Sequence, residues 1–242
     1  MKILIGCPTC DKYAYCINTW IQRVKEIIEF SRKQNPDHQI DYLLVDNSET
    51  DNFYISLKQK RINVIKSPYF DDLKKTLTDS RNMLRGKVLK ERYDYFLSLE
   101  QDVIPEEDII EKLLRHDKKI VSAYYGYHVG LKVQDKETNE IKNVTIETPI
   151  IYLQDGEEIR KALPNEILDK GLIKVGGFGV GCVLINREVL EKIKFRYEKE
   201  KASFDDLLFC FDAKKLGYDL FLDSDAKADH LHLANSMFRL KK

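Results

Sequence analysis

Short apolar runs alternate with helix-like stretches along the first half of the chain. The apolar runs predict buried strands at residues 2–6, 40–45, 63–66, 93–99 and 119–125. Apolar spacing of three and four residues, together with helix start and stop signals, predicts helices at residues 11–33, 53–60, 73–90 and 106–116. Strands that alternate with helices are typical of a mostly parallel sheet covered on both faces, so we expect an α/β fold.

The second half of the chain has a different pattern. Residues 128–160 carry a charged turn, QDKETNE, between two alternating runs, which predicts a hairpin excursion. The other predicted elements are a strand at 182–186, a helix from Arg187, a helix at 203–216, a strand at 218–222 and a polar, histidine-bearing tail at 226–236. The chain shows no internal repeat and no low-complexity linker, so we expect a single domain over residues 1–242.

The balance of charges restricts the partners that we expect. Lys and Arg together number 40, as do Asp and Glu, so the formal net charge is zero. No overall field attracts the chain to nucleic acid, and we expect no nucleic-acid partner. The apolar run at the N-terminus is too short for a signal peptide, and no stretch approaches the roughly 20 apolar residues of a spanning helix. The five cysteines lack the spacing of a secreted framework, so a cytoplasmic location is expected, with peripheral membrane association left open.

Polar clusters follow three of the predicted strands, at residues 7–11, 46–49 and 100–102. In parallel sheets, ligands bind outside the carboxyl ends of the strands. Glu100 and Asp102 therefore fall where a divalent cation would offset the cost of burying carboxylates, and Mg²⁺ and Mn²⁺ prefer such oxygen ligands. The alternative is a solvated acidic loop in front of a helix.

Further candidate residues lie in the second half. His230 and His232 could supply an imidazole to a metal held at Asp102, and His230 is preferred because it follows a predicted strand closely. Asp205 and Asp206 open a predicted helix, where acids are favourable on dipole grounds alone. Two adjacent buried acids would also repel each other, which could raise one pKa toward the range of a general base.

The glycine-rich run at residues 176–181 does not fit a dinucleotide-binding fingerprint, because a strand rather than a helix follows it. We interpret it as backbone that a substrate can approach closely. Cys7 and Cys10, between a strand and a helix, imitate a thiol–disulfide oxidoreductase site, which is the rival function.

Taken in order, these segments resemble the GT-A glycosyltransferases, especially their family-2-like group, over nearly the whole chain. The matching segments are Pro8-Thr9, Leu44-Val45-Asp46-Asn47-Ser48, Ser80-Arg81-Asn82, Glu100-Gln101-Asp102, residues 177–182, residues 205–210, and Gly217-Tyr218 through Asp223 with Lys227-Ala228-Asp229-His230. Two departures stand out: Glu100 replaces the first Asp of the metal motif, and Asp205 replaces a Glu in the second acidic pair.

The resemblance implies a Rossmann-like GT-A domain that transfers a sugar from a UDP- or GDP-sugar to a sugar, lipid-linked or protein acceptor. Residues 1–125 would bind the donor and residues 126–242 the acceptor. Implied donor contacts are Pro8, Thr9, Asp46, Asn47, Arg81, Glu100, Gln101 and Asp102. Asp102, His230 and Glu100 would hold Mn²⁺ or Mg²⁺. Asp206, alongside Asp205, would act as the base, and Gly177, Phe178 and Gly179 would face the acceptor.

Two questions stay open at this point. Whether the transfer inverts or retains the anomeric configuration is undecided, and in a retaining enzyme Asp206 would only position the acceptor. A non-catalytic nucleotide-binding module is a further alternative to an enzyme.

Overall fold

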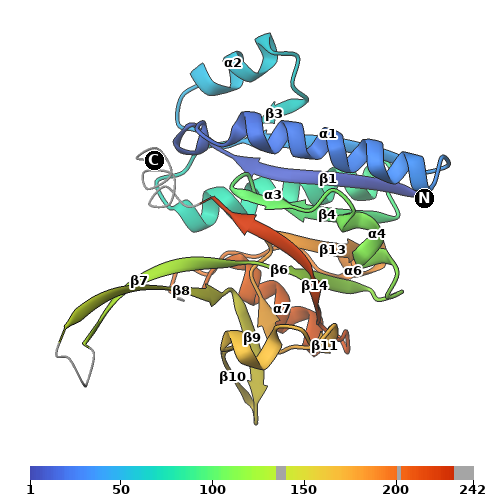
Figure 1. The fold of residues 1–242 in the computed structure, drawn as a ribbon. Coiled ribbons are helices and arrows are strands. Elements are labelled where there is room, and N and C mark those ends of the chain that lie inside the picture. Colours follow the sequence, from blue (N-terminus) through green and yellow to red (C-terminus); the bar gives the residue numbers. More distant parts are fainter. Residues whose placement is uncertain (135–139, 201–202, 232–242) are drawn as a thin grey trace.

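A twisted central sheet with helices on both faces forms the body of the protein (Figure 1). The computed structural model describes residues 1–134, 140–200 and 203–231. The sheet has the strand order β11-β14-β6-β13-β4-β1-β2-β3, and β5 pairs with β14 beside this path. The strands are β1 (Lys2–Thr9), β2 (Gln39–Asp46), β3 (Val64–Lys66), β4 (Tyr95–Leu99), β5 (Val103–Pro105), β6 (Ile120–Tyr124), β11 (Leu172–Lys174), β13 (Cys182–Asn186) and β14 (Phe221–His230).

The sheet is mixed, and the part formed by β4, β1, β2 and β3 consists of parallel strands. β1 pairs in parallel with β2 and β4, and β2 pairs in parallel with β3. β13 is antiparallel to both β4 and β6, whereas β14 runs parallel to β6. The expectation of a mixed α/β sheet with a large parallel part is therefore confirmed.

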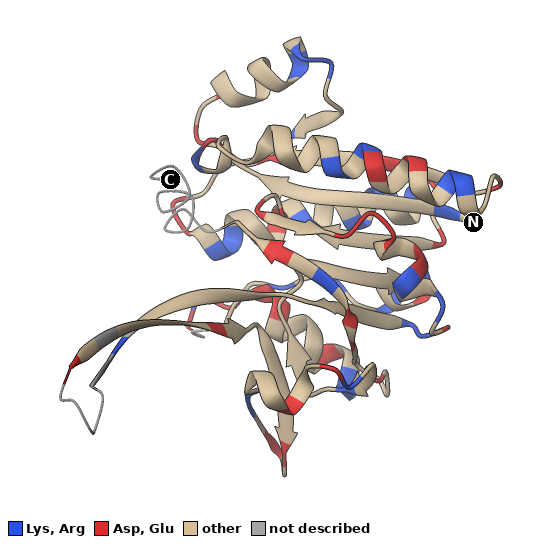
Figure 2. Cartoon of the chain, in the orientation of Figure 1, with Lys and Arg blue, Asp and Glu red and all other residues tan. Residues whose placement is uncertain are grey.

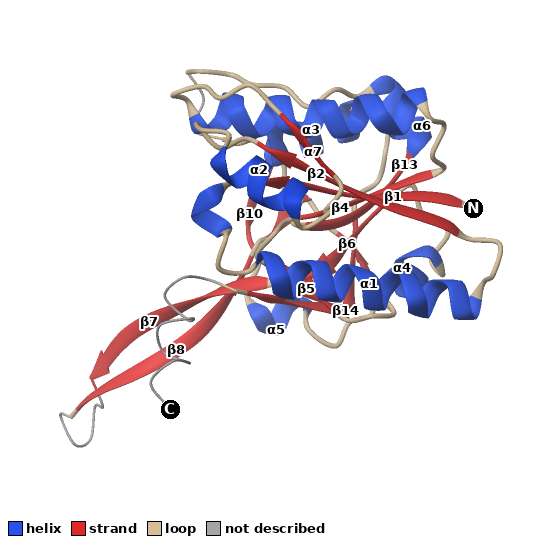
Figure 3. Ribbon diagram, turned by 90° about the horizontal axis from the view of Figure 1, so that it is seen from above, coloured by secondary structure: helices blue, strands red, loops and turns tan. Residues whose placement is uncertain are grey.

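Helices cover the sheet in two layers (Figure 3). Helices α1 and α4 lie on one face, and α3, α6 and α7 lie on the other. Their bounds are α1 (Ile17–Gln34), α2 (Asn52–Gln59), α3 (Leu73–Lys90), α4 (Ile109–Leu114), α5 (Pro164–Ile167), α6 (Arg187–Lys192) and α7 (Asp205–Lys215). The prediction for residues 73–90 matches α3 at both ends. Figure 2 marks both acidic and basic residues along α1, and the exposed ones include Lys25, Glu29 and Arg32, as expected for the solvated face of an amphipathic helix.

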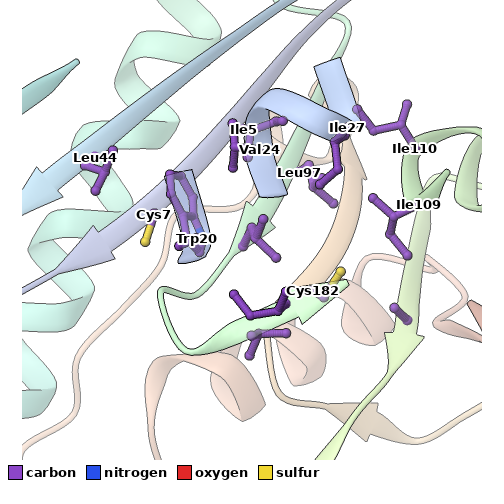
Figure 4. Close-up of a cluster of buried hydrophobic side chains, with 14 of the residues drawn as sticks. Ile5, Cys7, Trp20, Val24, Ile27, Leu44, Leu97, Ile109, Ile110 and Cys182 are labelled. Carbon is purple, nitrogen blue, oxygen red and sulfur yellow. The ribbon is translucent and has the colours of Figure 1, made fainter. Parts of the chain in front are cut away.

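Two apolar cores stabilise these layers. Trp20, Val24 and Ile27 of α1 recur at intervals of four and three residues and pack on the sheet together with Ile109 of α4 (Figure 4). The second core lies under α3, α6 and α7 and includes buried Leu84. Both cores hold the carboxyl ends of β1, β2 and β4 in fixed register.

Three predicted boundaries are wrong, each for a local reason. The helix expected at 11–33 is a 3₁₀ turn, Asp11–Tyr13, followed by α1. The helix expected at 106–116 starts later, at Ile109, because Val103–Pro105 pairs with β14 as strand β5. The polar tail expected from residue 226 is strand as far as His230, and its residues 232–236, with His232, lie outside the described residues.

The excursion expected at 128–160 contains two hairpins. β7 (Gly126–Gln134) and β8 (Ile141–Pro149) form a long ribbon that projects from the body (Figures 1 and 3). β9 (Ile151–Asp155) pairs with β10 (Glu158–Lys161) and with β12 (Gly177–Phe178). Among the described residues, no helix is both long and apolar enough to cross a bilayer.

A buried carboxylate ties β14 to the end of α4. The side chain of Asp223 is 0% exposed, and its Oδ2 lies 2.7 Å from Nε2 of His116 and 3.0 Å from the Arg115 guanidinium. Its Oδ1 accepts a hydrogen bond from the backbone N–H of Asp225. Burial alone would raise the pKa of Asp223, but the hydrogen bonds and the charge of Arg115 lower it on balance.

Replacing Asp223 with Asn should therefore lower the free energy of unfolding at pH 7 by about 1–3 kcal/mol. A lowered pKa means that this contribution is present at neutral pH and is lost as the pH falls through the folded-state pKa. In urea unfolding, the difference in the free energy of unfolding between the wild type and Asp223→Asn should shrink below about pH 4. Asp219→Asn, at an exposed ion pair with Lys174, is the control and should change stability by less than about 1 kcal/mol. A difference in the free energy of unfolding that stays constant down to pH 2 would contradict the stabilising role of the Asp223 carboxylate.

Candidate functional site

A pocket of about 350 Å³ opens at the carboxyl ends of β1, β2 and β4. The predicted site residues that line it are Pro8, Thr9, Asn47, Arg81, Glu100, Gln101, Asp102, Asp206 and His230. Its other lining residues are Cys10, Tyr13, Leu73, Leu77 and Phe204. The predicted site residues that lie outside this lining are Asp46, Asp205, Gly177, Phe178 and Gly179.

Asp102 and His230 meet in this pocket although they are 128 residues apart. Oδ2 of Asp102 lies 3.2 Å from Nε2 of His230, and the two side chains are 12% and 11% exposed. The ladder between β5 and β14 places His230 opposite Val103, and the N–H of Leu231 donates to the carbonyl of Asp102 at 2.7 Å. Burial would lower the pKa of His230, but Asp102, Glu100 and a backbone contact raise it on balance.

Arg81 of α3 is the buried cation of the site. Its guanidinium is 2% exposed and forms ion pairs with Glu100, at the end of β4, and with Asp205, at the start of α7. Partial burial raises the pKa of Glu100 to about 7, against the opposing charge of Arg81, and nearby Asp102 and Asp206 add to the rise. Arg81 therefore holds three elements of the pocket together.

The two acids of α7 have different surroundings. The Asp205 side chain is 0% exposed, is paired with Arg81 and does not line the pocket. Asp206 lines the pocket, and its Oδ1 accepts a hydrogen bond from the N–H of Leu207. Burial raises the pKa of Asp206, with Arg81 opposing. The structure thus separates a residue that anchors the helix from one that lines the pocket.

Polar contacts across the strand ends fix the other side of the pocket. The hydroxyl of Thr9 donates to Oε1 of Gln101, and the Gln101 amide donates to the carbonyl of Tyr13 at 2.7 Å. The amide of Asn47 donates to the hydroxyl of Ser80 at 3.1 Å. These contacts join the ends of β1, β2 and β4 to α3.

Asp46 does not line the pocket, in contrast to the nucleobase contact that the resemblance implies. Its side chain is 0% exposed, and Oδ2 accepts from Lys66 Nζ at 2.9 Å. Oδ1 accepts from the backbone N–H and from the hydroxyl of Ser48, at 3.1 and 2.6 Å. Lys66 also donates to the carbonyl of Thr50 at 2.8 Å. The carboxylate of Asp46 therefore organises the loop after β2 from within.

The glycine-rich run makes room for a tyrosine of the protein itself. A Cβ atom added at Gly179 or Gly181 would lie 2.6 Å from the hydroxyl oxygen of Tyr125, which accepts a hydrogen bond from the Gly181 N–H at 2.7 Å. Phe178 is 0% exposed and belongs to the core, and Gly177 is buried. Gly177, Phe178 and Gly179 thus lie in internal packing, and their expected contacts with an acceptor stay a prediction.

The cysteine environment does not support the rival oxidoreductase. Cys7 is 0% exposed within β1, and burial raises its pKa well above the ordinary value, with Glu100 and Asp102 adding to the rise. Burial also raises the pKa of Cys10, and the first α-helix begins only at Ile17. A redox-active thiol needs a lowered pKa, which this site does not provide.

The Asp102–His230 pair suits a divalent cation that is shared with a substrate. Among the described residues, no group of three or more His, Cys, Asp or Glu side chains is arranged to enclose a metal ion. Mg²⁺ and Mn²⁺ sites that bind phosphates commonly use only one or two protein carboxylates, with phosphate and water oxygens as the remaining ligands. A carboxylate oxygen and an imidazole nitrogen 3.2 Å apart in a pocket fit this type of site.

Comparison with known proteins identifies the fold. No protein-family model matches the chain, and no curated protein matches its sequence. Among solved structures, GalNAc-T7 with UDP, GalNAc and Mn²⁺ has a TM-score of 0.58 at 12% identity, over 96% of this chain and 43% of that one. S. aureus TarS has a TM-score of 0.56 at 13% identity, over 99% of this chain and 38% of that one. The protein has a GT-A-like fold.

A third GT-A-like neighbour is the mannosyltransferase PcManGT from Pyrobaculum calidifontis in complex with GDP-Man and Mn²⁺. It has a TM-score of 0.53 at 12% identity, over 95% of this chain and 56% of that one. This chain therefore spans between 38% and 56% of the length of the three neighbours. Likeness at such low identity establishes the GT-A-like arrangement of strands and helices.

Several lining residues of the pocket were missed by the sequence motifs. Leu73, Leu77 and Phe204 line the pocket, as does Tyr13. Intervals of four residues put Leu73, Leu77 and Arg81 on one face of α3. These intervals are visible in the sequence and could have indicated that the two leucines lie beside Arg81. Phe204 has no comparable signal, because its place depends on how α7 packs.

Replacing Arg81 with Met should lower the free energy of unfolding by about 3–5 kcal/mol, because it leaves Glu100 and Asp205 without their cation. Urea unfolding monitored by circular dichroism measures the change. The control is Arg23→Met, at a surface pair with Glu26, which should cost less than about 1 kcal/mol. Equal small losses for both variants would show that Arg81 is not the centre of the network.

Proposed function

We propose that this protein is a glycosyltransferase that uses a nucleotide-diphosphate sugar and a divalent cation. The observation that carries the proposal is the meeting of Asp102 and His230 in a pocket at the carboxyl ends of the parallel strands. In open α/β sheets this edge is where ligands bind. The GT-A-like neighbours add support, because GalNAc-T7 was solved with UDP and Mn²⁺ and PcManGT with GDP-Man and Mn²⁺.

The pocket divides into a donor end and a reacting end. Thr9, Asn47 and Gln101 offer hydroxyl and amide groups at the ends of β1, β2 and β4, which suit the nucleoside of a UDP- or GDP-sugar. Asp102 and His230 would hold Mn²⁺ or Mg²⁺ against the diphosphate. The bound cation would supply a positive charge that neutralises the charge growing on the leaving diphosphate.

Arg81 acts in this scheme by positioning acids. Its ion pair with Glu100 keeps that side chain beside Asp102, and its ion pair with Asp205 sets the start of α7. We therefore assign Asp102 and His230 as the ligands of the cation and Glu100 as a partner of Arg81. Arg81 lines the pocket as well, where its charge favours an anionic donor.

In this scheme Asp206 accepts a proton from the acceptor. Burial raises its pKa toward the range in which a carboxylate is an effective base. In an inverting transfer, Asp206 would take the proton from the acceptor hydroxyl as the oxygen attacks the anomeric carbon. In a retaining transfer it would orient that hydroxyl.

Replacing Asp102 with Ala should leave the fold intact and abolish cation-dependent nucleotide binding. In the wild type, UDP or GDP with Mn²⁺ at 100 times the dissociation constant should stabilise the protein by about 2.7 kcal/mol, which a thermal-shift assay detects. Asp108→Ala removes a nearby acid that lies outside the pocket and should keep the full shift. A wild-type Mn²⁺-dependent shift in Asp102→Ala would refute the metal assignment.

Replacing Asp206 with Asn should lower turnover about 100-fold or more and leave nucleotide affinity within a few-fold of the wild type. Hydrolysis of UDP- and GDP-sugars can be followed with water as the acceptor, so the test needs no knowledge of the natural acceptor. Asp212→Asn lies on the same helix, paired with Arg196, and serves as the control. A large loss of nucleotide affinity with unchanged turnover would place Asp206 at the donor, and absence of any hydrolysis in the wild type would favour a binding module.

A further inference from the structure

One side of the pocket is apolar between the buried Arg81 and the solvent. Leu73, Leu77 and Arg81 follow one another at intervals of four residues on α3 and all line the pocket. Arg81 is 2% exposed at the deep end, whereas Leu73 is 63% exposed at the outer end of this row. The row therefore leads from the buried ion pairs to solvent over leucine side chains.

The start of α7 supplies the facing part of this apolar side. Phe204 lines the pocket, is 40% exposed, and precedes Asp206 by two residues. The ion pair of Arg81 with Asp205 fixes this turn against α3, and Lys74 Nζ lies 5.9 Å from the centre of the Phe204 ring. We call Leu73, Leu77 and Phe204 the apolar wall.

The apolar wall differs chemically from the donor end. Hydroxyl and amide groups of Thr9, Asn47 and Gln101 lie at the strand ends, whereas the apolar wall offers hydrocarbon on the two helices. Single exposed leucines are common on protein surfaces and need no ligand to explain them. Several large apolar side chains inside one concave pocket, next to convergent polar groups, are typical of a binding site for a ligand with an apolar part.

The apolar wall lies on the Asp206 side of the pocket. Since Phe204 is the N-cap residue of α7 and Asp206 lies in the first turn of that helix, a hydroxyl that reaches Asp206 brings its attached group close to Phe204. Leu77 and Leu73 then continue the apolar surface toward the mouth. A ligand with a polar head and a hydrocarbon part would match this order of groups.

We propose that the acceptor is amphiphilic, with its hydroxyl-bearing head at Asp206 and a hydrocarbon chain along Leu77, Leu73 and Phe204. This inference rests on the proposed function, because it takes the hydroxyl at Asp206 to be the acceptor. Among the sugar, lipid-linked and protein acceptors that the resemblance implies, it selects an acceptor with a lipid-like chain. The chain gains free energy by leaving water for the apolar wall, so affinity depends on its length.

The test uses n-alkyl β-D-glucosides with hexyl, heptyl and octyl chains as probes, each below its micelle-forming concentration. Binding to the full chain is measured by calorimetry without nucleotide, and UDP and GDP binding with Mn²⁺ is measured separately. Affinity should rise about two- to fourfold for each added methylene. Leu73→Ser and Phe204→Ser should reduce this dependence on chain length and leave nucleotide affinity within twofold of the wild type.

Leu163→Ser is the matched control, since Leu163 is 59% exposed and does not line the pocket. It should keep the wild-type dependence on chain length, and circular dichroism checks that all three variants are folded. The proposal would be overturned if the affinity of the wild type for the alkyl glucosides did not depend on chain length. It would also be overturned if Leu163→Ser lost as much of this dependence as Leu73→Ser and Phe204→Ser. A tenfold loss of nucleotide affinity in Leu73→Ser or Phe204→Ser would also overturn it, by assigning the apolar wall to the donor. Failure of Mn²⁺-dependent nucleotide binding in the wild type would instead count against the glycosyltransferase function.

Discussion

The short ladder between β5 and the end of β14 is the contact on which the proposed site depends. It pairs Val103 with His230 and so brings an imidazole from near the end of the described chain to Asp102. β14 is also held by β6 along its first half and by the buried carboxylate of Asp223. Strand pairing therefore fixes the distance between two side chains that no local interaction could bring together.

Burial of several acids in one pocket is the second constraint. Glu100, Asp205 and Asp206 lie near one another, and desolvation raises the pKa of each of these three acids. Arg81 offsets this cost by pairing with Glu100 and Asp205. The arrangement leaves Asp102 beside His230 and Asp206 near the apolar wall, so the acid that we propose as the cation ligand and the acid that we propose as the base have different surroundings.

The sequence was sufficient for features that depend on local pattern and failed for those that depend on distant packing. Alternating strands and helices predicted the sheet, and the bounds of α3 were correct because its apolar spacing and its Asp72 cap are local signals. The motif at residue 46 did not show that Lys66, on the next strand, would engage Asp46. The glycine-rich run likewise gave no sign that Tyr125, far away in sequence, would occupy the space beside Gly181. Side-chain partners across strands are set by tertiary packing, which short motifs do not encode.

The central claim is that a divalent cation binds between Asp102 and His230 together with a nucleotide diphosphate. Anomalous X-ray scattering at the manganese edge, from crystals grown with Mn²⁺ and UDP or GDP, tests it most directly. The account predicts an anomalous peak in contact with the Asp102 carboxylate, the His230 imidazole and the diphosphate oxygens. A nucleotide bound in the pocket with manganese elsewhere, and with the direct Asp102–His230 hydrogen bond intact, would contradict it.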